Sequence, residues 1–244
     1  MTDAKDPLKR QHRFYKSVSV EPDGEGYSVR LDGRTPKSPK AARLILPTQA
    51  LAELVASEWD AQGETLNFHI MPATRLAHTA LDVVAGARAA SVEGVVKFGG
   101  SDLLCYFAEH PKGLIHRQEK VWGPLLDWAK DELGLEFLRT HGIVHKTQDP
   151  AMLARLTAMV EPLADADLAG LAFAASLFGS VIIALALRAG RIKAEHAMAA
   201  SRLDEIFQEE RWGVDAEAEA KADAMAVEAV MVERWFRALQ PAAR

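Results

Sequence analysis

Residues 168–187 read LAGLAFAASLFGSVIIALAL, twenty consecutive positions without a charged side chain. A membrane-spanning helix needs about twenty such residues, so this stretch decides between a membrane protein and a buried helix. Only ten of the twenty side chains are large and apolar, and the others are alanine, glycine or serine. Asp165 and Asp167 precede the stretch and Arg188 follows it, so no basic cluster sets an orientation in a membrane. The sequence therefore favours a helix buried on every side within a helical domain, with a membrane anchor as the alternative.

The composition is typical of a globular protein. The chain has 244 residues, of which 49% are hydrophobic and 26% are charged, enough for one large domain or two smaller ones. A net charge of −5 argues against nucleic-acid binding, because phosphates need a basic face. A single cysteine, Cys105, allows no internal disulfide, and the first residues lack the apolar core of a secretory signal. We expect a bacterial cytoplasmic protein, or a mitochondrial matrix protein if the source is eukaryotic.

The first part of the chain shows the pattern of short strands. An alternating run around Val18 and Val20 is followed by the turn residues EPDGEG and a second apolar run. Asp32-Gly33 is a strong hairpin signal, and ARLILPT predicts a third strand. Three or four short strands are too few to be stable alone, so the sheet should pack on the segment that follows.

From Thr48, which can cap a helix, the apolar period changes from two to 3.6. We therefore expect an α+β fold. It comprises a small antiparallel β domain with a flexible N-terminus over residues 1–48. This domain packs on a larger all-helical domain over residues 49–244, built around one central helix at 168–187.

Several helices are predicted within the second part. Asp149-Pro150 reads as a helix cap followed by a first-turn proline. Residues 91–108 should be helical with an interruption at Gly99-Gly100, after which Ser101 would cap the next helix. The last helix has an apolar seam with alternating spacings of four and three, which predicts packing along another helix. The seam residues are Ala218, Ala222, Met225, Ala229, Val232, Phe236 and Leu239.

A search for catalytic and metal-binding patterns finds no site. His141 and His145 have the spacing of helical metal ligands, but Gly-Ile-Val between them favours an extended backbone that separates the two rings. Cys105 lies among apolar residues and is expected in the core. No glycine-rich phosphate loop occurs. We expect no catalytic residue, no cofactor and no metal.

Several stretches, in order, resemble one family, the assembly chaperones that attend the alpha subunit of the F1 sector of ATP synthase. The matching stretches run from residue 13 to about 220 and are RFYKSVSV, LDGRTPKSP, FHIMPATRLAHTALD, SDLLCYFAEHP, QEKVWGPLLDWA, LFGSVIIALALRAGRI and LDEIFQEERWGVDAEAE. The resemblance implies a non-enzymatic protein that binds newly made alpha subunit before it pairs with beta. Unassembled subunits expose apolar interfaces that promote aggregation, and a chaperone would cover them reversibly.

The resemblance also implies a functional acidic position in the helix before Trp212-Gly213. Glu205 is the first choice for this position. The expected partner-binding residues are Glu205, Asp204, Gln208, Glu209, Trp212 and Asp102. The alternative for Glu205 is an ion pair with Arg202, three residues earlier, which would only make the helix soluble. The alternative for the whole protein is a small-molecule enzyme of unknown reaction. We expect a monomer with no membrane span.

Overall fold

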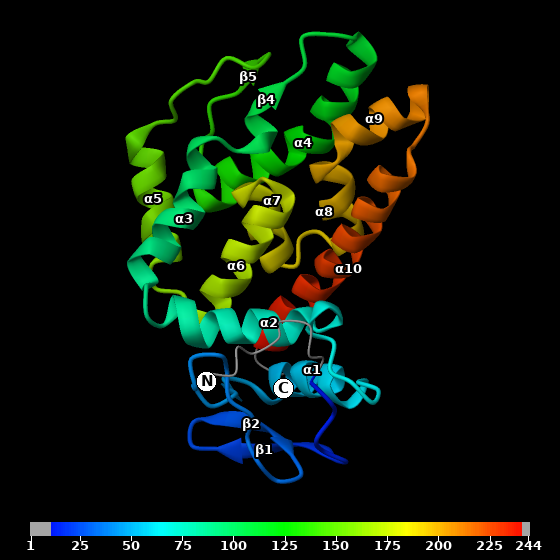
Figure 1. Ribbon diagram of the computed structural model, residues 1–244. Coiled ribbons are helices and arrows are strands. Elements are labelled where there is room, and N and C mark those ends of the chain that lie inside the picture. Colours follow the sequence, from blue (N-terminus) through cyan, green and yellow to red (C-terminus); the bar gives the residue numbers. More distant parts are fainter. Residues whose placement is uncertain (1–10, 241–244) are drawn as a thin grey trace, which may run out of the picture.

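The computed structural model describes residues 11–240 (Figure 1). The strands are β1 (Val18–Asp23), β2 (Gly26–Leu31), β3 (Ile45–Leu46), β4 (Tyr106–Phe107) and β5 (Thr140–His141). The α-helices are α1 (Gln49–Asp60), α2 (Pro72–Thr79), α3 (Arg88–Gly100), α4 (Lys112–Leu133), α5 (Pro150–Val160), α6 (Asp165–Phe178), α7 (Val181–Arg188), α8 (Ala194–Ser201), α9 (Leu203–Trp212) and α10 (Ala216–Leu239). Short helical segments are η1 (Phe68–Ile70), η2 (Ala80–Val84) and η3 (Leu103–Cys105).

The N-terminal strands form an antiparallel sheet in the order β1-β2-β3. Its first turn uses Gly24, whose φ of 64° suits glycine because no side chain is strained there. The hairpin predicted at Asp32-Gly33 is confirmed: both residues have positive φ, and Leu31 pairs with Arg34 across the turn. The fold class is likewise confirmed as α+β, with this sheet at one end of the molecule and the helices stacked above it (Figure 1).

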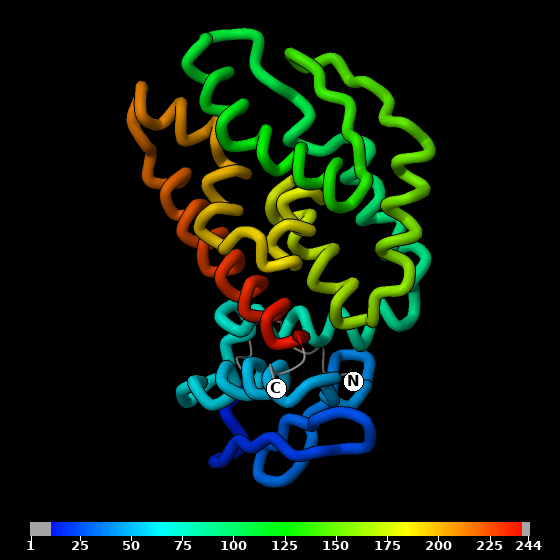
Figure 2. The backbone as a smooth tube through the Cα atoms, turned by 180° about the vertical axis from the view of Figure 1, so that it is seen from behind, coloured from blue at the N-terminus to red at the C-terminus, as the bar shows by residue number. Residues whose placement is uncertain are grey.

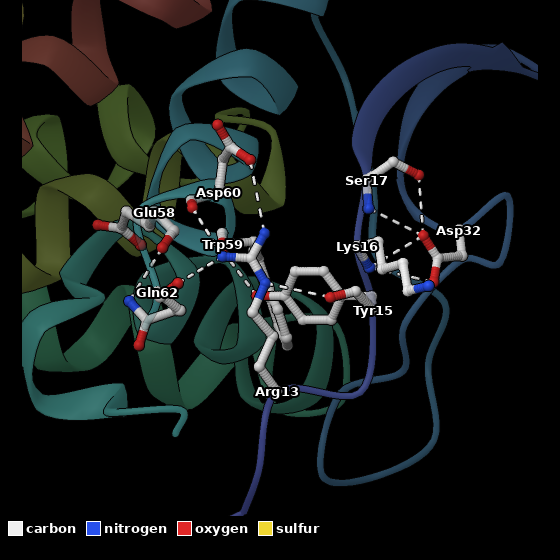
Figure 3. Close-up of polar contacts among 9 residues, drawn as sticks. All are labelled: Arg13, Tyr15, Lys16, Ser17, Asp32, Glu58, Trp59, Asp60 and Gln62. Atoms are coloured by element: carbon white, nitrogen blue, oxygen red, sulfur yellow. Dashed lines mark hydrogen bonds and ion pairs between the residues drawn. The ribbon is translucent and has the colours of Figure 1, made fainter. Parts of the chain in front are cut away.

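The segment before β1 is fastened to the end of α1. The Arg13 guanidinium donates hydrogen bonds to the carbonyl oxygens of Asp60, at 3.1 Å, and of Gln62. The Tyr15 hydroxyl donates to the carbonyl oxygen of Trp59 at 2.6 Å. Trp59 and Asp60 are the last two residues of α1, where carbonyl groups have no partner further along the helix, and Gln62 follows the helix end. Figure 3 shows both side chains reaching this helix end, so the RFYKSVSV stretch joins the sheet to α1.

Both ends of α1 are held by long-range contacts. At its start, the Thr48 hydroxyl oxygen accepts a hydrogen bond from the Leu51 amide at 3.2 Å, as the sequence predicted. The same hydroxyl donates to the carbonyl oxygen of Ala238, at the end of α10, at 2.6 Å. The body of α1 packs against β1, β2 and α10. A boundary between two domains at residue 48 stays a prediction, because one apolar core includes residues on both sides of it.

The uncharged stretch at 168–187 forms two helices, so the prediction of one central helix is wrong. Gly179 has a φ of 64°, a conformation that ends α6 and that glycine adopts without strain. Ser180 is extended, and its hydroxyl accepts from the Ile183 amide at 3.1 Å, which starts α7. The two helices lie in the middle of the helical part in both views (Figures 1 and 2). No helix within residues 11–240 is both long enough and apolar enough to cross a membrane.

The helix predicted after Gly99-Gly100 is also wrong. Asp102, and not Ser101, caps a single turn of 3-10 helix, η3, and the chain then becomes extended. In β4, Phe107 pairs with His141 of β5 in a two-stranded parallel sheet. The helical part therefore contains a short strand pair that the expectation of an all-helical domain omitted. His141 itself is extended in β5, but the extended backbone expected between His141 and His145 is not found, because Gly142 has a φ of 76° and the chain bends there.

The apolar seam of α10 is buried in its second half, as predicted. Ala229, Val232 and Phe236 are almost fully buried where α10 packs against α6 and α8. The first half, including Met225, is only half-buried, because it extends beyond these helices toward α9. Figure 1 shows α10 running along the edge of the helical part, from α9 down to α1.

Gly170 sets the distance between α6 and α10, and this contact gives a first prediction. A Cβ atom at Gly170 would lie 2.9 Å from the rings of Trp235 and Phe236, closer than real contacts allow. Alanine has better helix propensity than glycine by about 1 kcal/mol, but pushing two packed rings costs typically 1–3 kcal/mol. Gly170→Ala should therefore lower the free energy of unfolding, measured by denaturant titration, by about 1 kcal/mol.

Gly94 of α3 is the matched control, since a Cβ atom there meets nothing within 4 Å. Gly94→Ala should raise the free energy of unfolding by up to about 1 kcal/mol through helix propensity alone. Equal stabilisation by both substitutions would contradict the close contact at Gly170.

Candidate partner-binding surface on α9

Helix α9 is placed by two apolar side chains and ended by a glycine. Leu203 and Phe207, four residues apart, are buried on the side that faces α4 and α8. The helix ends where the Gly213 amide donates to the carbonyl oxygen of Glu209 at 2.9 Å. Gly213 has a φ of 86°, which turns the chain toward α10. The other residues of α9 are exposed, except Asp204, Ile206 and Glu209, which are half-buried.

Two arginines enclose the ring of Phe207. The guanidinium carbons of Arg211 and Arg117 lie 4.0 and 5.3 Å from the ring centroid. Arg117 of α4 also forms two hydrogen bonds of 2.8 Å with the carboxylate of Glu210. This hydrogen bonding lowers the pKa of Glu210 and raises that of Arg117. The pair is exposed, so it orients α9 on α4 more than it stabilises the fold.

Asp204 faces inward. Its carboxylate accepts a hydrogen bond of 2.7 Å from the side-chain amide of Gln118, which is fully buried in α4. The other end of the Gln118 amide accepts from the Ala108 backbone amide at 2.8 Å. Burial is the main cause that raises the pKa of Asp204 above its ordinary value. Asp204 thus connects α9 to α4 and to the residue after β4.

Glu209 is also engaged within the protein, because its carboxylate forms an ion pair of 2.5 Å with Arg202. Arg202 is the residue that would have neutralised Glu205 in the alternative interpretation of the sequence. Instead Glu205 is exposed and takes part in no ion pair within 4 Å among residues 11–240. Its carboxylate is free to meet another molecule.

Glu205, Gln208 and Trp212 share the outward side of α9, and we call these three residues the α9 face. Their spacings of three and four residues place them in one row. The Trp212 side chain is 78% exposed, and Val214, just after the helix, is 54% exposed. The α9 face therefore offers one carboxylate, one amide and one indole ring to solvent, a set suited to binding another protein.

The whole chain was also compared with known proteins. The family model described as ATP12 chaperone protein matches residues 12–130. The crystal structure of Atp12 from Paracoccus denitrificans is 40% identical in sequence, with a TM-score of 0.88, over 94% of this chain and 99% of that one. The chain belongs to the ATP12 chaperone family. An aspartate-to-lysine mutant of the Paracoccus denitrificans protein matches with the same identity and TM-score, over 94% of this chain and 98% of that one.

A more distant relative is the mitochondrial protein atp12 of Schizosaccharomyces pombe. It is 26% identical over 227 residues, which cover 87% of this chain and 78% of the relative. The ATP12 family thus includes a mitochondrial and a bacterial member among these relatives.

In this ATP12 chain Asp102 lies in the interior, which corrects its place among the expected contact residues. It has no exposed surface, so it cannot reach a partner on the folded protein. One carboxylate oxygen accepts from the Leu104 amide at 3.0 Å and the other from the Ile182 amide at 3.2 Å. Burial raises the pKa of Asp102 to about 6, although hydrogen bonds from Ser180 and from backbone amides oppose the shift. Asp102 therefore joins η3 to the start of α7.

The structure also places the cysteine and the two histidines that the sequence analysis considered for chemistry. Burial is the main cause that raises the pKa of the Cys105 thiol, which disfavours the reactive thiolate. His145 meets the Tyr106 hydroxyl at 2.9 Å through Nδ1, and His141 lies near the Ala108 carbonyl oxygen at 3.4 Å. Within the described part of the chain, no group of three or more His, Cys, Asp or Glu side chains is arranged to hold a metal ion.

Three residues of the surroundings of α9 escaped the sequence analysis. Arg117, Gln118 and Phe207 orient α9, but their partners lie up to 93 residues away in the chain. The only available signal was that Gln118 and Phe207 lie inside the two stretches QEKVWGPLLDWA and LDEIFQEERWG that resemble the family. Their contacts could not be inferred from spacing.

Proposed function

We propose that this protein is a chaperone of F1 ATP synthase assembly that binds the unassembled alpha subunit and keeps it from aggregating until it pairs with beta. Membership of the ATP12 chaperone family supports the chaperone role. The alpha subunit as the client, the absence of an enzymatic activity and the monomeric state are parts of the proposal. The cytoplasm of a bacterium, or the mitochondrial matrix in a eukaryote, is the proposed compartment.

The exposure of Trp212 is the observation that most supports α9 as the binding surface. A tryptophan with 78% of its side chain in water presents a large apolar area that association with another protein would bury. Tryptophan is enriched among the few residues that supply most of the binding energy in protein interfaces. The free carboxylate of Glu205 lies on the same side of α9, so the surface combines apolar contact with a negative charge.

Co-expression with F1 alpha in the absence of beta tests the proposal. The soluble fraction is separated by size-exclusion chromatography. Alpha should stay soluble and co-elute with this chain, and added beta should displace the chain from the complex. Aggregation of alpha at the same level with and without this chain, with no shared peak, would refute the proposed function.

Glu205→Lys is expected to weaken binding of alpha by about tenfold, because reversing a charge in an interface replaces attraction with repulsion. Stability should change by less than about 1 kcal/mol, since the side chain is exposed. Titration of labelled alpha and thermal unfolding measure the two effects.

Glu93→Lys is the matched control, because Glu93 is an exposed carboxylate on α3, away from α9. It should leave the binding of alpha unchanged. A loss of stability in Glu205→Lys, or an equal loss of binding in both variants, would show that the α9 face does not recognise alpha.

A further inference from the structure

Helix α10 is apolar on two opposite sides. Its inward side carries the buried seam described above. On its outward side, small and aliphatic residues recur at helical spacing between exposed charged residues. Ala216, Ala220, Val227 and Val230, at helical spacing, are all exposed, with Val227 at 63% and Val230 at 51%. The outward row extends along most of a helix of 24 residues, about 36 Å at 1.5 Å per residue.

The lower part of this row forms one wall of a groove. Val227 and Val230 line the groove together with Ile70, the last residue of η1, which is 62% exposed. Leu54 of α1 and Met231 of α10 line the groove between them, which has a volume of about 470 Å³. We call this the α10 groove. Three exposed aliphatic side chains around one groove form an apolar patch of the kind found at protein interfaces.

Charges are distributed unevenly along the outward side of α10. Near its start, on the side of α9, Glu217, Glu219 and Asp223 are exposed. Near its end, Arg234 and Arg237 are exposed, and Arg234 lines the α10 groove. Neither arginine has a carboxylate within 4 Å among residues 11–240. The groove therefore has an apolar centre with Arg234 at one end, and Glu58 also belongs to its lining. Arg234 and Arg237 line a neighbouring hollow together with Glu53, and the acidic start of α10 also carries the exposed Lys221.

We infer that the α10 groove binds an amphipathic helix of the client subunit. The aliphatic residues of that helix pack between Ile70, Val227 and Val230. Its carboxylates meet Arg234 and Arg237, and its basic residues lie toward the acidic start of α10. An amphipathic helix laid in an apolar groove is a recurrent mode of recognition, and the charge distribution fixes its direction. The inference rests on the proposed function, because the client is the F1 alpha subunit.

Small and apolar residues between the α9 face and the α10 groove are exposed. Gly213 joins α9 to α10, and the exposed Val214, Ala216 and Ala220 lead from Trp212 toward Val227. A client that contacts Trp212 can therefore extend along α10 without leaving the surface. Two linked contacts on one client strengthen binding beyond either contact alone.

Glutamate substitutions test the groove. Val227→Glu and Val230→Glu place a charge in its apolar centre, and each should weaken binding of alpha by about tenfold in titration with labelled alpha. Val144→Glu is the matched control, because Val144 is 71% exposed in the loop after β5 and should not affect binding. Both groove valines are exposed, so the thermal unfolding of the variants should match that of the parent protein.

A charge reversal tests the direction of the bound helix. Arg234→Glu with Arg237→Glu should weaken binding of alpha by about tenfold and make it less sensitive to salt. If the parent protein binds alpha and the valine and arginine variants bind it equally well, the α10 groove is not the binding site. The proposed function would then still stand. Failure of the parent protein to bind alpha would overturn both. A parent protein that is dimeric in sedimentation and becomes monomeric on Val227→Glu would assign the groove to a second copy and overturn the inference.

Discussion

Replacing Trp212 with alanine is expected to weaken the complex with the F1 alpha subunit by about 30-fold, which corresponds to roughly 2 kcal/mol. The ring is 78% exposed in the free protein, so its removal takes away contact area in the complex and little from the fold. This separation of effects distinguishes a binding residue from a core residue. Titration of labelled alpha measures the affinity, and thermal unfolding should change by less than about 1 kcal/mol.

Two further variants control for this result. Trp212→Phe retains an aromatic ring and should recover part of the affinity. Phe14→Ala removes another exposed ring, 60% exposed and on the segment that precedes the sheet, and should leave binding unchanged. If Trp212→Ala bound alpha as tightly as the parent protein, the partner would have to use a surface other than α9.

Asp102→Ala should be among the most destabilising single substitutions in this chain, with a loss of about 3 kcal/mol in the free energy of unfolding at pH 7.5. The carboxylate accepts from the amides of Leu104 and Ile182, and both amides would remain buried without an acceptor. A buried unsatisfied donor costs about 1–3 kcal/mol, so two of them account for the expected loss. Denaturant titration measures it.

The loss should depend on pH. Burial raises the pKa of Asp102 from 3.8 to about 6, so between these values the folded protein keeps a proton that the unfolded chain releases. The contribution of Asp102 to stability is therefore greatest below pH 4 and decreases as the pH rises through 6. Between pH 7.5 and pH 5 the cost of Asp102→Ala should increase by about 1 kcal/mol.

Asp149 provides the control for burial. Its carboxylate also caps a helix, accepting from the Ala151 amide at 2.9 Å, but it is exposed. Asp149→Ala should cost only about 1 kcal/mol, the usual value for an exposed cap. If the two substitutions cost the same free energy of unfolding, or if the cost of Asp102→Ala does not change with pH, burial does not determine the contribution of Asp102.

The sequence predicted an element correctly where the contact that determines it joins residues close together in the chain. Thr48 caps α1 through an amide three residues away, and Asp149-Pro150 starts α5, both as predicted. The turn at Asp32-Gly33 depends on the conformational freedom of those two residues, so it could also be predicted from the sequence. In each case the side chain and its partner lie within a few positions of one another.

The wrong predictions depend on contacts across the chain. An uncharged stretch gives no warning that Gly179 and Ser180 will end one helix and begin another, because the same residues also occur inside buried helices. Asp102 acquires its role from the Ile182 amide, 80 residues later. Its other carboxylate oxygen caps η3 through the Leu104 amide, and the chain becomes extended at Tyr106, in β4.

The α9 site shows the same limit at shorter range. Asp204 and Glu205 are adjacent and chemically similar, yet the first is bound to Gln118 and the second faces solvent. In the structure Glu205, Gln208 and Trp212 lie in one row at helical spacing, but only the position of α4 determines which acid is enclosed. The family resemblance pointed to the helix that we propose as the binding surface, and the packing determines which of its residues are exposed.

The hydrogen bond between Thr48 and Ala238 has a consequence for biosynthesis. Its partners are 190 residues apart, so the side of α1 that faces α10 stays uncovered while nearly the whole chain is translated. At 5–20 residues per second this interval lasts about 10–40 seconds. The packing of α1 therefore depends on α10, the last helix to be synthesised among the described residues. During that time this chain exposes apolar surface of its own, on the side of α1 that α10 covers in the folded protein.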